Sequence, residues 1–274
     1  MTNHSESRAD PRALESPGGS LTVPSTKLAS VNPSLDRSPV NQAVVDSADP
    51  LTGDARVMQY LGDSYEAMAR FHALLCDQGV LRGLIGPREA GRLWERHILN
   101  SASVAALLPS RGRLIDVGSG AGLPGIVLAA MLPGVEVTLL EPMERRVHWL
   151  QEVAERLGLA NVVVVRGRAE EVHGKIEAEV VTARAVAPLD RLVRWTMPLL
   201  VRGGVLIALK GRQASGEVAD ARSELKKFGA GPPEVFEAGT IDGVENTTVV
   251  RITRENVLGT KAPRGSAKRP RGRG

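Results

Sequence analysis

The sequence predicts an α/β domain built on a doubly wound, mostly parallel sheet. From residue 111 onward, short runs rich in β-branched residues alternate with longer amphipathic runs, which is typical of βαβ units. A glycine-rich loop follows the first of these strands, at the edge where open α/β sheets bind ligands. The last two predicted strands are joined by a short turn-rich link, so they can pair only antiparallel.

The chain has 274 residues, of which 42% are hydrophobic, enough for one ordinary domain with tails. Residues 1–53 are rich in Ser, Pro, Asn and Asp and are predicted to be disordered. Residues 256–274 hold six Lys or Arg and no acid, and they are predicted to form a basic disordered tail. That tail either attracts phosphates or only keeps the chain in solution. The tail contributes +6 and residues 1–50 contribute −2 to the net charge of +4, so residues 51–255 are close to neutral.

Several classes of protein are disfavoured by composition. Cys76 is the single cysteine, so an intrachain disulfide and a cysteine-based metal site are excluded. The five histidines have no short ligand spacing, and no metal is expected. The sequence has no apolar run of membrane-spanning length and no apolar leader near its start. These features predict a cytoplasmic protein with no membrane partner.

Residues 54–110 are predicted to form a helical N-terminal extension. Apolar residues recur there at spacings of three and four, as they do on one face of a helix. Gly79 is a candidate C-cap, and Gly86 with Pro87 marks a turn before the next helical stretch. The apolar positions that define the pattern are Val57, Tyr60, Leu61, Met68, Phe71, Leu74, Leu75, Leu93, Trp94, Ile98, Leu99, Leu107 and Leu108.

Residues 111–255 are predicted to form the α/β domain. Five parallel strands are expected over 113–117, 135–140, 162–165, 179–185 and 205–210. Helices are expected over 123–132, 143–158, 169–176, 188–201 and 215–228. Two further strands, over 234–238 and 247–253, would add an antiparallel hairpin at one end of the sheet and bring it to seven strands.

The glycine loop allows two interpretations. Gly120, Gly122 and Gly125 match the dinucleotide fingerprint, and Glu141 stands 21 residues after Gly120, where a ribose-binding acid is expected. In the other register the motif begins at Asp116 and continues through Gly118. An acid at the strand end suits a ligand with an ammonium group and no phosphate, such as the amino-acid end of S-adenosylmethionine. Asp116 and the terminal hairpin favour S-adenosylmethionine, whereas Glu141 would take the ribose hydroxyls of either ligand.

A set of longer motifs resembles one known family. The segments that carry the resemblance are 96–101 (RHILNS), 116–126 (DVGSGAGLPGI), 145–152 (RRVHWLQE), 167–171 (GRAEE), 182–187 (TARAVA) and 208–211 (ALKG). They closely resemble the bacterial small-subunit ribosomal RNA guanine-N7 methyltransferases, also called glucose-inhibited division protein B. The resemblance covers residues 54–253, and the glycine loop preceded by RHILNS is much more specific than the glycines alone.

The resemblance implies a Rossmann-like class I methyltransferase fold that binds S-adenosylmethionine. It implies methylation of guanine N7 in the decoding-region loop of 16S rRNA, with 16S rRNA or the small ribosomal subunit as partner. Gly118 and Leu123 would then line the donor pocket, Ala169 and Glu170 would meet the adenine, and Arg184 would face the donor. Together with Asp116, Gly120 and Glu141, these residues form the predicted cofactor-binding set.

No general base is predicted, because guanine N7 carries no proton and its lone pair is free to attack the methyl group. The enzyme must instead align the nucleophile, the methyl carbon and the sulfur. Arg184 is the candidate orienting residue, and His97 is interpreted as a buried or capping histidine. For Lys210 two roles stay open: a contact with an RNA phosphate, or a solvated charge at the end of a strand. Two other functions stay open: a nicotinamide-dependent oxidoreductase, and a non-catalytic RNA-binding assembly factor on the same fold.

Two departures from the family pattern affect the predicted substrate contacts. Asn100 stands where many relatives have Asp. Residues 82–85 read RGLI, where many relatives have an Asn-Leu-Thr stretch, so a substrate role for that segment is not expected.

Overall fold

The computed structural model describes residues 49–255. The predicted disordered tails therefore lie outside the described residues, except for 49–53, where the prediction was wrong. Asp49 is buried, and its carboxylate accepts a hydrogen bond of 2.8 Å from the Trp94 backbone N–H. The folded part thus begins at least five residues before the predicted boundary at residue 54. No local pattern indicates this, because Asp49 is a single acid followed by Pro50, with no helical or strand periodicity around it.

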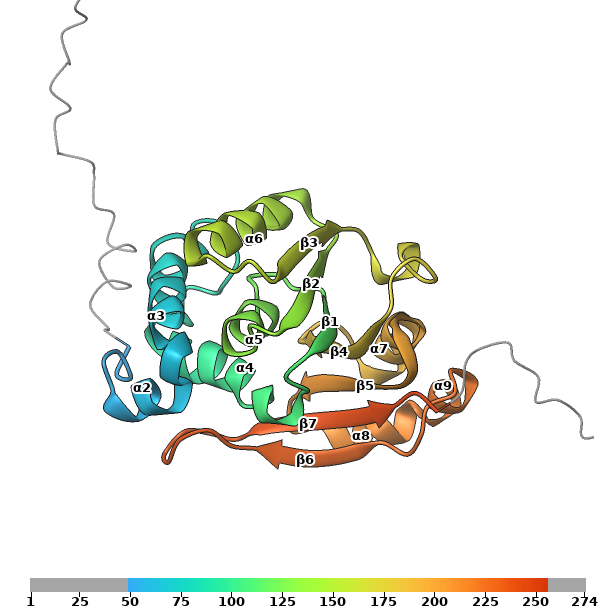
Figure 1. Cartoon of the computed structure of the whole chain (residues 1–274). Coiled ribbons are helices and arrows are strands. Elements are labelled where there is room, and N and C mark those ends of the chain that lie inside the picture. The colour runs from blue at the N-terminus through green and yellow to red at the C-terminus, as the bar shows by residue number, and fades with distance from the viewer. Residues whose placement is uncertain (1–48, 256–274) are drawn as a thin grey trace, which may run out of the picture. The chain divides into compact units, whose positions relative to one another are not determined.

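The domain is built on one seven-stranded sheet in the order β3-β2-β1-β4-β5-β7-β6 (Figure 1). The strands are β1 (Gly112–Val117), β2 (Val135–Glu141), β3 (Val162–Arg166), β4 (Ala178–Arg184), β5 (Leu200–Lys210), β6 (Glu234–Ala238) and β7 (Thr247–Thr253). The first five are parallel, and β7 pairs antiparallel with both β5 and β6. The predicted parallel sheet with its terminal hairpin is confirmed.

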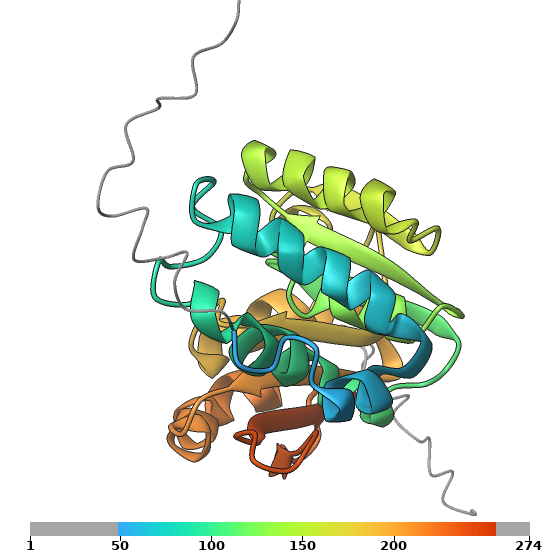
Figure 2. The ribbon, with the colours of Figure 1, turned by 90° about the vertical axis from the view of Figure 1, so that its left-hand side faces the viewer.

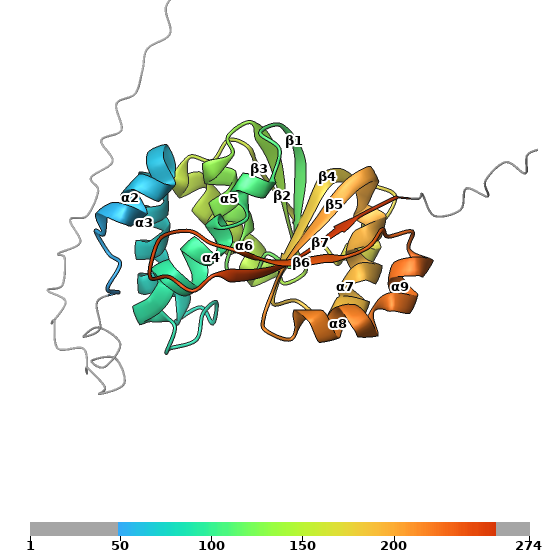
Figure 3. The ribbon, with the colours of Figure 1, turned by 90° about the horizontal axis from the view of Figure 1, so that it is seen from below.

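Helices cover both faces of this sheet (Figure 3). One face carries the short helices α2 (Ala55–Leu61) and α4 (Asn100–Ala102) with α3 (Tyr65–Leu74), α5 (Gly125–Met131) and α6 (Glu144–Leu157). The other carries α7 (Leu189–Thr196), α8 (Ala214–Asp220) and α9 (Arg222–Lys227). Each face has its own apolar core. None of the helices within residues 49–255 is long and apolar enough to cross a membrane.

Three predicted helices differ in extent from the observed ones. The predicted helix 188–201 ends earlier, because β5 already begins at Leu200 and bends through Gly203, whose φ is +81°. The predicted helix 215–228 is broken at Ala221 into α8 and α9. Residues 169–176 contain only one 3₁₀ turn, Ala169–Glu171. In each case the apolar pattern runs across the boundary and does not reveal it.

The helical extension is part of the same globular unit as the sheet. Helix α3 runs alongside α6 (Figure 2), and its Phe71 and Met68 are fully buried in the core shared with α5 and α6. Within the extension, the segment Trp94–Leu99 before α4 winds as a π-helix. Such wider turns are rare and occur frequently at functional sites. This one brings the RHILNS segment to the carboxyl edge of the sheet.

Candidate functional site

Two cavities meet at the carboxyl edge of the parallel strands. The first, of about 370 Å³, lies over the ends of β1–β3, and we call it the β1–β3 cavity. The second, of about 670 Å³, lies beside the ends of β5 and β7 and is closed on one side by the helical extension; we call it the β5–β7 cavity. Arg184 and Ala185 line both, so the end of β4 forms the junction between them.

The glycine loop between β1 and α5 forms one wall of the β1–β3 cavity. Gly118 and Gly120 have φ values of +71° and +57°, a region that favours glycine. A Cβ atom on Gly118 would lie 3.0 Å from the Val186 side chain. Any side chain at position 118 would crowd Val186, so only glycine leaves room for a ligand to approach the loop backbone. The Gly118 N–H donates to the Leu140 carbonyl at 2.8 Å.

Asp116 lies beneath this loop and not in the cavity wall. It is fully buried, one carboxylate oxygen accepts from the Gly125 N–H at 3.0 Å, and the other accepts from the Thr182 hydroxyl at 3.2 Å. Burial raises the pKa of Asp116 to about 6. The predicted direct contact with an ammonium group is therefore corrected: Asp116 positions the loop from below.

Glu141, at the end of β2, joins the loop to the cavity. Its side chain is 2% exposed, and its two oxygens accept from the N–H groups of Gly120 at 2.9 Å and Met143 at 3.0 Å. Each carboxylate oxygen has a second lone pair, so Glu141 can still accept hydrogen bonds from a ligand in the cavity. Its role as the ribose-binding acid stays a prediction.

The structure brings together only part of the predicted cofactor set. Gly118, Glu141, Ala169, Glu170 and Arg184 line the β1–β3 cavity.

The remaining three predicted residues stand outside that wall. Leu123 is 4% exposed and packs in the apolar core, so its predicted place in the pocket is corrected. Gly120 and Asp116 act through the loop, as described above. The backbone turns of the loop decide which of its residues face the cavity and which face away. The spacing of the glycines in the sequence does not reveal this.

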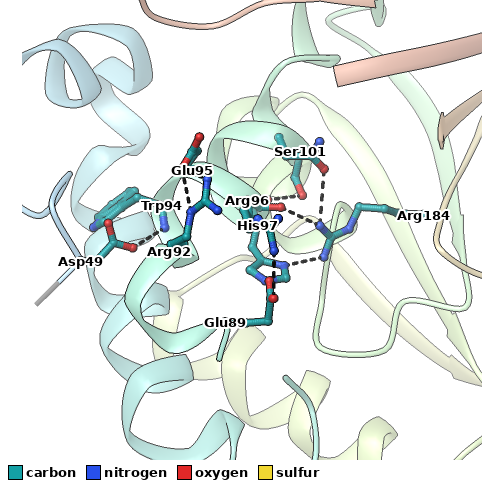
Figure 4. A network of polar contacts seen from close by, with 10 residues as sticks. Asp49, Glu89, Arg92, Trp94, Glu95, Arg96, His97, Ser101 and Arg184 are labelled. Atoms are coloured by element: carbon teal, nitrogen blue, oxygen red, sulfur yellow. Dashed lines mark hydrogen bonds and ion pairs between the residues drawn. The ribbon is translucent and has the colours of Figure 1, made fainter. Parts of the chain in front are cut away.

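Arg184 extends from the end of β4 toward the helical extension (Figure 4). Its Nη1 donates to the Arg96 carbonyl at 3.1 Å and lies 3.4 Å from Asn100 Oδ1, and its Nη2 lies 3.1 Å from His97 Nδ1. Burial lowers the pKa of Arg184 to about 10, so the guanidinium stays charged at neutral pH. The next residue, Ala185, has a φ of +54°, a strained value for alanine that turns the chain at the cavity junction.

His97 is half-buried, with 14% of its side chain exposed, and it links Arg184 to Glu89. Its Nε2 lies 3.0 Å from Glu89 Oε2 on one side, and its Nδ1 faces the guanidinium on the other. Burial and the nearby Arg184 charge lower the pKa of His97 to about 4, outweighing Glu89. The imidazole is therefore neutral, with its proton on Nε2.

Lys210 fits neither of the two predicted roles. Its side chain is 9% exposed, and Nζ lies 2.6 Å from Glu217 and donates to the Ala187 carbonyl at 2.8 Å. Glu217 also accepts from the Leu189 N–H at 2.8 Å. The pair thus fixes the chain between β4 and α7 against α8, and Lys210 contributes to the wall of the β5–β7 cavity as a buried ion-pair partner.

Arg146 is a cavity residue that the sequence analysis did not assign. It lines the β1–β3 cavity, and its buried Nε has no hydrogen-bond acceptor among the described residues. Its position in the RRVHWLQE motif, directly after the strand that ends at Glu141, is the signal that could have identified it. Residues 82–85, by contrast, line neither cavity: Arg82 lies over the Trp149 ring, 5.1 Å from its centroid.

Side chains that could hold a metal ion do not gather anywhere in the described part of the chain. The seven-stranded sheet, its terminal hairpin and a cavity over the ends of β1–β3 define a class I methyltransferase fold. The chain belongs to the family described as rRNA small subunit methyltransferase G, whose model matches residues 64–239.

Curated relatives carry the same description. The "Ribosomal RNA small subunit methyltransferase G" of Thermobifida fusca is 51% identical over 218 residues, covering 78% of this chain and 92% of the relative. That of Salinispora arenicola is 48% identical, covering 83% and 97%. Among solved structures, an S-adenosylmethionine-dependent O-methyltransferase of Thermotoga maritima aligns with a TM-score of 0.46 at 18% identity, over 57% of this chain and 65% of the other.

Proposed function

We propose that the protein transfers a methyl group from S-adenosylmethionine to N7 of a guanine in the decoding-region loop of 16S rRNA. The observation that carries the proposal is the junction of two cavities at Arg184 and Ala185 in a member of this family. One cavity is formed by the predicted donor motif, and the other opens beside it. A donor and an acceptor base can therefore meet at the end of β4.

The β1–β3 cavity fits S-adenosylmethionine. Its volume of about 370 Å³ is within the range of small-molecule pockets. The Glu141 carboxylate suits ribose hydroxyls, and the unpartnered Arg146 Nε supplies a buried donor at the same wall. The ligand supplies a methyl group on a sulfonium sulfur. The residues of the chain bind and orient it, and the glycine loop permits its close approach.

The β5–β7 cavity is the proposed place of the acceptor guanine. Its charged lining is balanced, with four acidic side chains, those of Glu89, Glu95, Glu217 and Glu245, and four basic ones, those of Arg96, Arg184, Lys210 and Arg212. Methylation at N7 leaves a positive charge on the base while the sulfonium charge of the donor is lost, so the cavity needs no net negative charge. Since N7 carries no proton, none of the lining side chains needs to act as a base.

Family membership favours this function over the two alternatives. A nicotinamide-dependent oxidoreductase would be stabilised by NADH, whereas this protein should be stabilised by S-adenosylhomocysteine, because a ligand that binds only the folded state raises its stability. A non-catalytic assembly factor on this fold would bind RNA without modifying it. The proposed site of action is the cytoplasm, where small ribosomal subunits are assembled.

The test is transfer of labelled methyl groups. Purified full-length protein is incubated with methyl-labelled S-adenosylmethionine and with deproteinised 16S rRNA, unmethylated small subunits or large subunits. Label in the small-subunit RNA, and none in the large subunit, is expected. Stabilisation by S-adenosylhomocysteine without transfer to any of the three would contradict the enzymatic function and favour the assembly factor.

A further inference from the structure

We infer that His97 is a positioning residue, which holds the Arg184 guanidinium in one orientation at the junction of the two cavities. This inference rests on the proposed function, because it concerns the group that faces both the donor and the acceptor base. His97 lines neither cavity. It acts through Arg184, and Glu89 in turn fixes His97 (Figure 4).

The geometry sets the direction of each hydrogen bond. The guanidinium has donors only, so His97 Nδ1, 3.1 Å from Arg184 Nη2, must offer its lone pair. The proton of the neutral ring is then on Nε2 and is donated to Glu89 Oε2 at 3.0 Å. Glu89 is itself held at 3.1 Å by Arg96. A chain of three residues thereby selects one tautomer and one ring orientation.

Arg184 keeps donors for a ligand in this arrangement. A guanidinium has five N–H groups, and the described residues supply acceptors for three of them: the Arg96 carbonyl, Asn100 Oδ1 and His97 Nδ1. Two N–H groups remain on a side chain that lines both cavities. Without the Nδ1 acceptor, the guanidinium could rotate and direct them elsewhere, and methyl transfer depends on alignment.

A purely structural role for His97 would give a different outcome. His97 lies on the π-helical segment Trp94–Leu99, so it could simply attach the extension to the sheet. Removing such an attachment would lower stability and impair donor and RNA binding together. A positioning role instead lowers the rate of transfer at saturating donor and RNA, and it depends on which ring nitrogen is replaced.

Two amide variants separate these roles. The side-chain amide of His97→Asn reaches the position of Nδ1 and can accept from Arg184, whereas that of His97→Gln reaches the position of Nε2 and retains only the bond to Glu89. His148→Gln on the exposed face of α6 is the matched control, since His148 lines neither cavity. For each full-length variant, the single-turnover rate of RNA methylation, the affinity for S-adenosylhomocysteine and the melting temperature are measured.

We expect His97→Gln to lower the single-turnover rate roughly tenfold or more, the effect typical of removing one hydrogen bond to a charged group. Donor affinity and melting temperature should stay close to those of the unaltered protein. His97→Asn should recover most of the rate, and His148→Gln should retain it. Equal rates for His97→Gln and the unaltered protein, or equal decreases in both amide variants, would overturn the inference.

A second measurement does not depend on activity. The ¹⁵N shifts of the His97 ring, recorded in the full-length protein, should show the Nε2–H tautomer throughout pH 5 to 8. An Nδ1–H tautomer, or a protonated ring in that range, would overturn the inference even if the variants failed to fold. If instead the unaltered protein methylates no RNA, the proposed function fails. The His97 tautomer would still show whether His97 accepts a hydrogen bond from Arg184.

Discussion

The Nδ1 atom of His97 lies 3.1 Å from the Nη2 atom of Arg184, although 87 positions separate the two residues in the sequence. His97 comes from the helical extension and Arg184 from the end of β4. The contact shows that the extension is a part of the site. A class I sheet alone would leave the β5–β7 cavity without the wall formed by Glu89, Glu95 and Asn100.

Replacement of Arg184 should slow methyl transfer more than it weakens donor binding. Arg184→Ala removes the group shared by both cavities, and we expect the single-turnover rate to fall on the order of 10- to 100-fold, because catalysis here depends on alignment. Arg184→Lys keeps the charge but lacks the planar fork, so it should recover only a small part of the rate. Rapid-quench measurements at saturating donor and RNA check this. A decrease confined to donor affinity would show that Arg184 only binds the donor.

Glu141→Ala should weaken binding of S-adenosylhomocysteine by about 1–3 kcal/mol, because the ribose loses its hydrogen-bond acceptor and the glycine loop becomes less ordered. The loop is affected because Glu141 also holds the Gly120 N–H. Titration calorimetry measures the change. Glu144→Ala is the control, since Glu144 is exposed and only pairs with Arg166. Unchanged affinity in Glu141→Ala would remove Glu141 from the donor site.

The sheet could be predicted almost completely from the sequence, and the reason is physical. Central parallel strands are buried on both faces, so they stand out as continuous apolar runs such as VLIAL at 205–209, of which residues 206–209 are buried. The nearness of the strands at 234–238 and 247–253 then allowed only an antiparallel pair, which the structure contains. The predicted function came from the family motifs, because the spacing of strands alone does not indicate a function.

The details of the site could not be predicted, because they depend on which way each side chain faces. Asp116 and Leu123 stand in the expected motif, yet one lies below the loop and the other lies in the core. Lys210 looks solvated in sequence, but it ends β5 and its partner Glu217 comes from helix α8. The contact between His97 and Arg184 joins two distant segments, and neither local pattern indicates it.

The ion pair between His72 and Asp49 predicts a decrease in stability at alkaline pH. The two side chains lie 3.5 Å apart. Burial disfavours a charged His72, but Asp49 and Cys76 outweigh it and raise the pKa of His72 to about 9. The folded state therefore binds a proton that the unfolded state releases above about pH 6.5. This stabilisation is complete below that pH and is lost as the pH rises through about 9.

Urea unfolding at pH 6 to 9 measures this effect. The free energy of unfolding should decrease over that range by at most about 1.4 kcal/mol per pH unit from this one group. His72→Asn should flatten the decrease, and His148→Asn, at an exposed position on α6, should not. Parallel pH profiles for all three proteins would show that His72 is not charged in the folded state.

Deletion of residues 256–274 should lower RNA affinity and its dependence on salt, and leave donor binding intact. Strand β7 starts beside Lys210 and ends beside Val205, so residue 255 lies at the edge of the sheet opposite the cavities. Donor binding should therefore not depend on the residues that follow. Each RNA phosphate that the tail neutralises should add about 0.7–0.9 to the slope of log K against log salt, and the deletion should remove that share. Filter binding at several salt concentrations gives the slopes. Equal slopes for the full-length and shortened chains would leave the tail only a solubilising role.

The rate of methyl transfer should be nearly independent of pH from about 6 to 9. Guanine N7 needs no deprotonation, the pKa of His97, about 4, lies below this range, and that of Asp116, about 6, lies at its lower end. Single-turnover rates at saturating donor and RNA give the profile. A tenfold rise per pH unit that a single substitution abolishes would reveal an essential base and contradict this mechanism.

The position of the methyl group on the base tests the central claim most directly. Small-subunit RNA treated with the protein and S-adenosylmethionine is reduced with borohydride and cleaved with aniline, which breaks the chain only at N7-methylguanine. We expect a single new break within the decoding-region loop of 16S rRNA, absent when the donor is omitted. Labelled RNA that resists this cleavage, with the methyl group on N1 or on an exocyclic amine, would contradict the account.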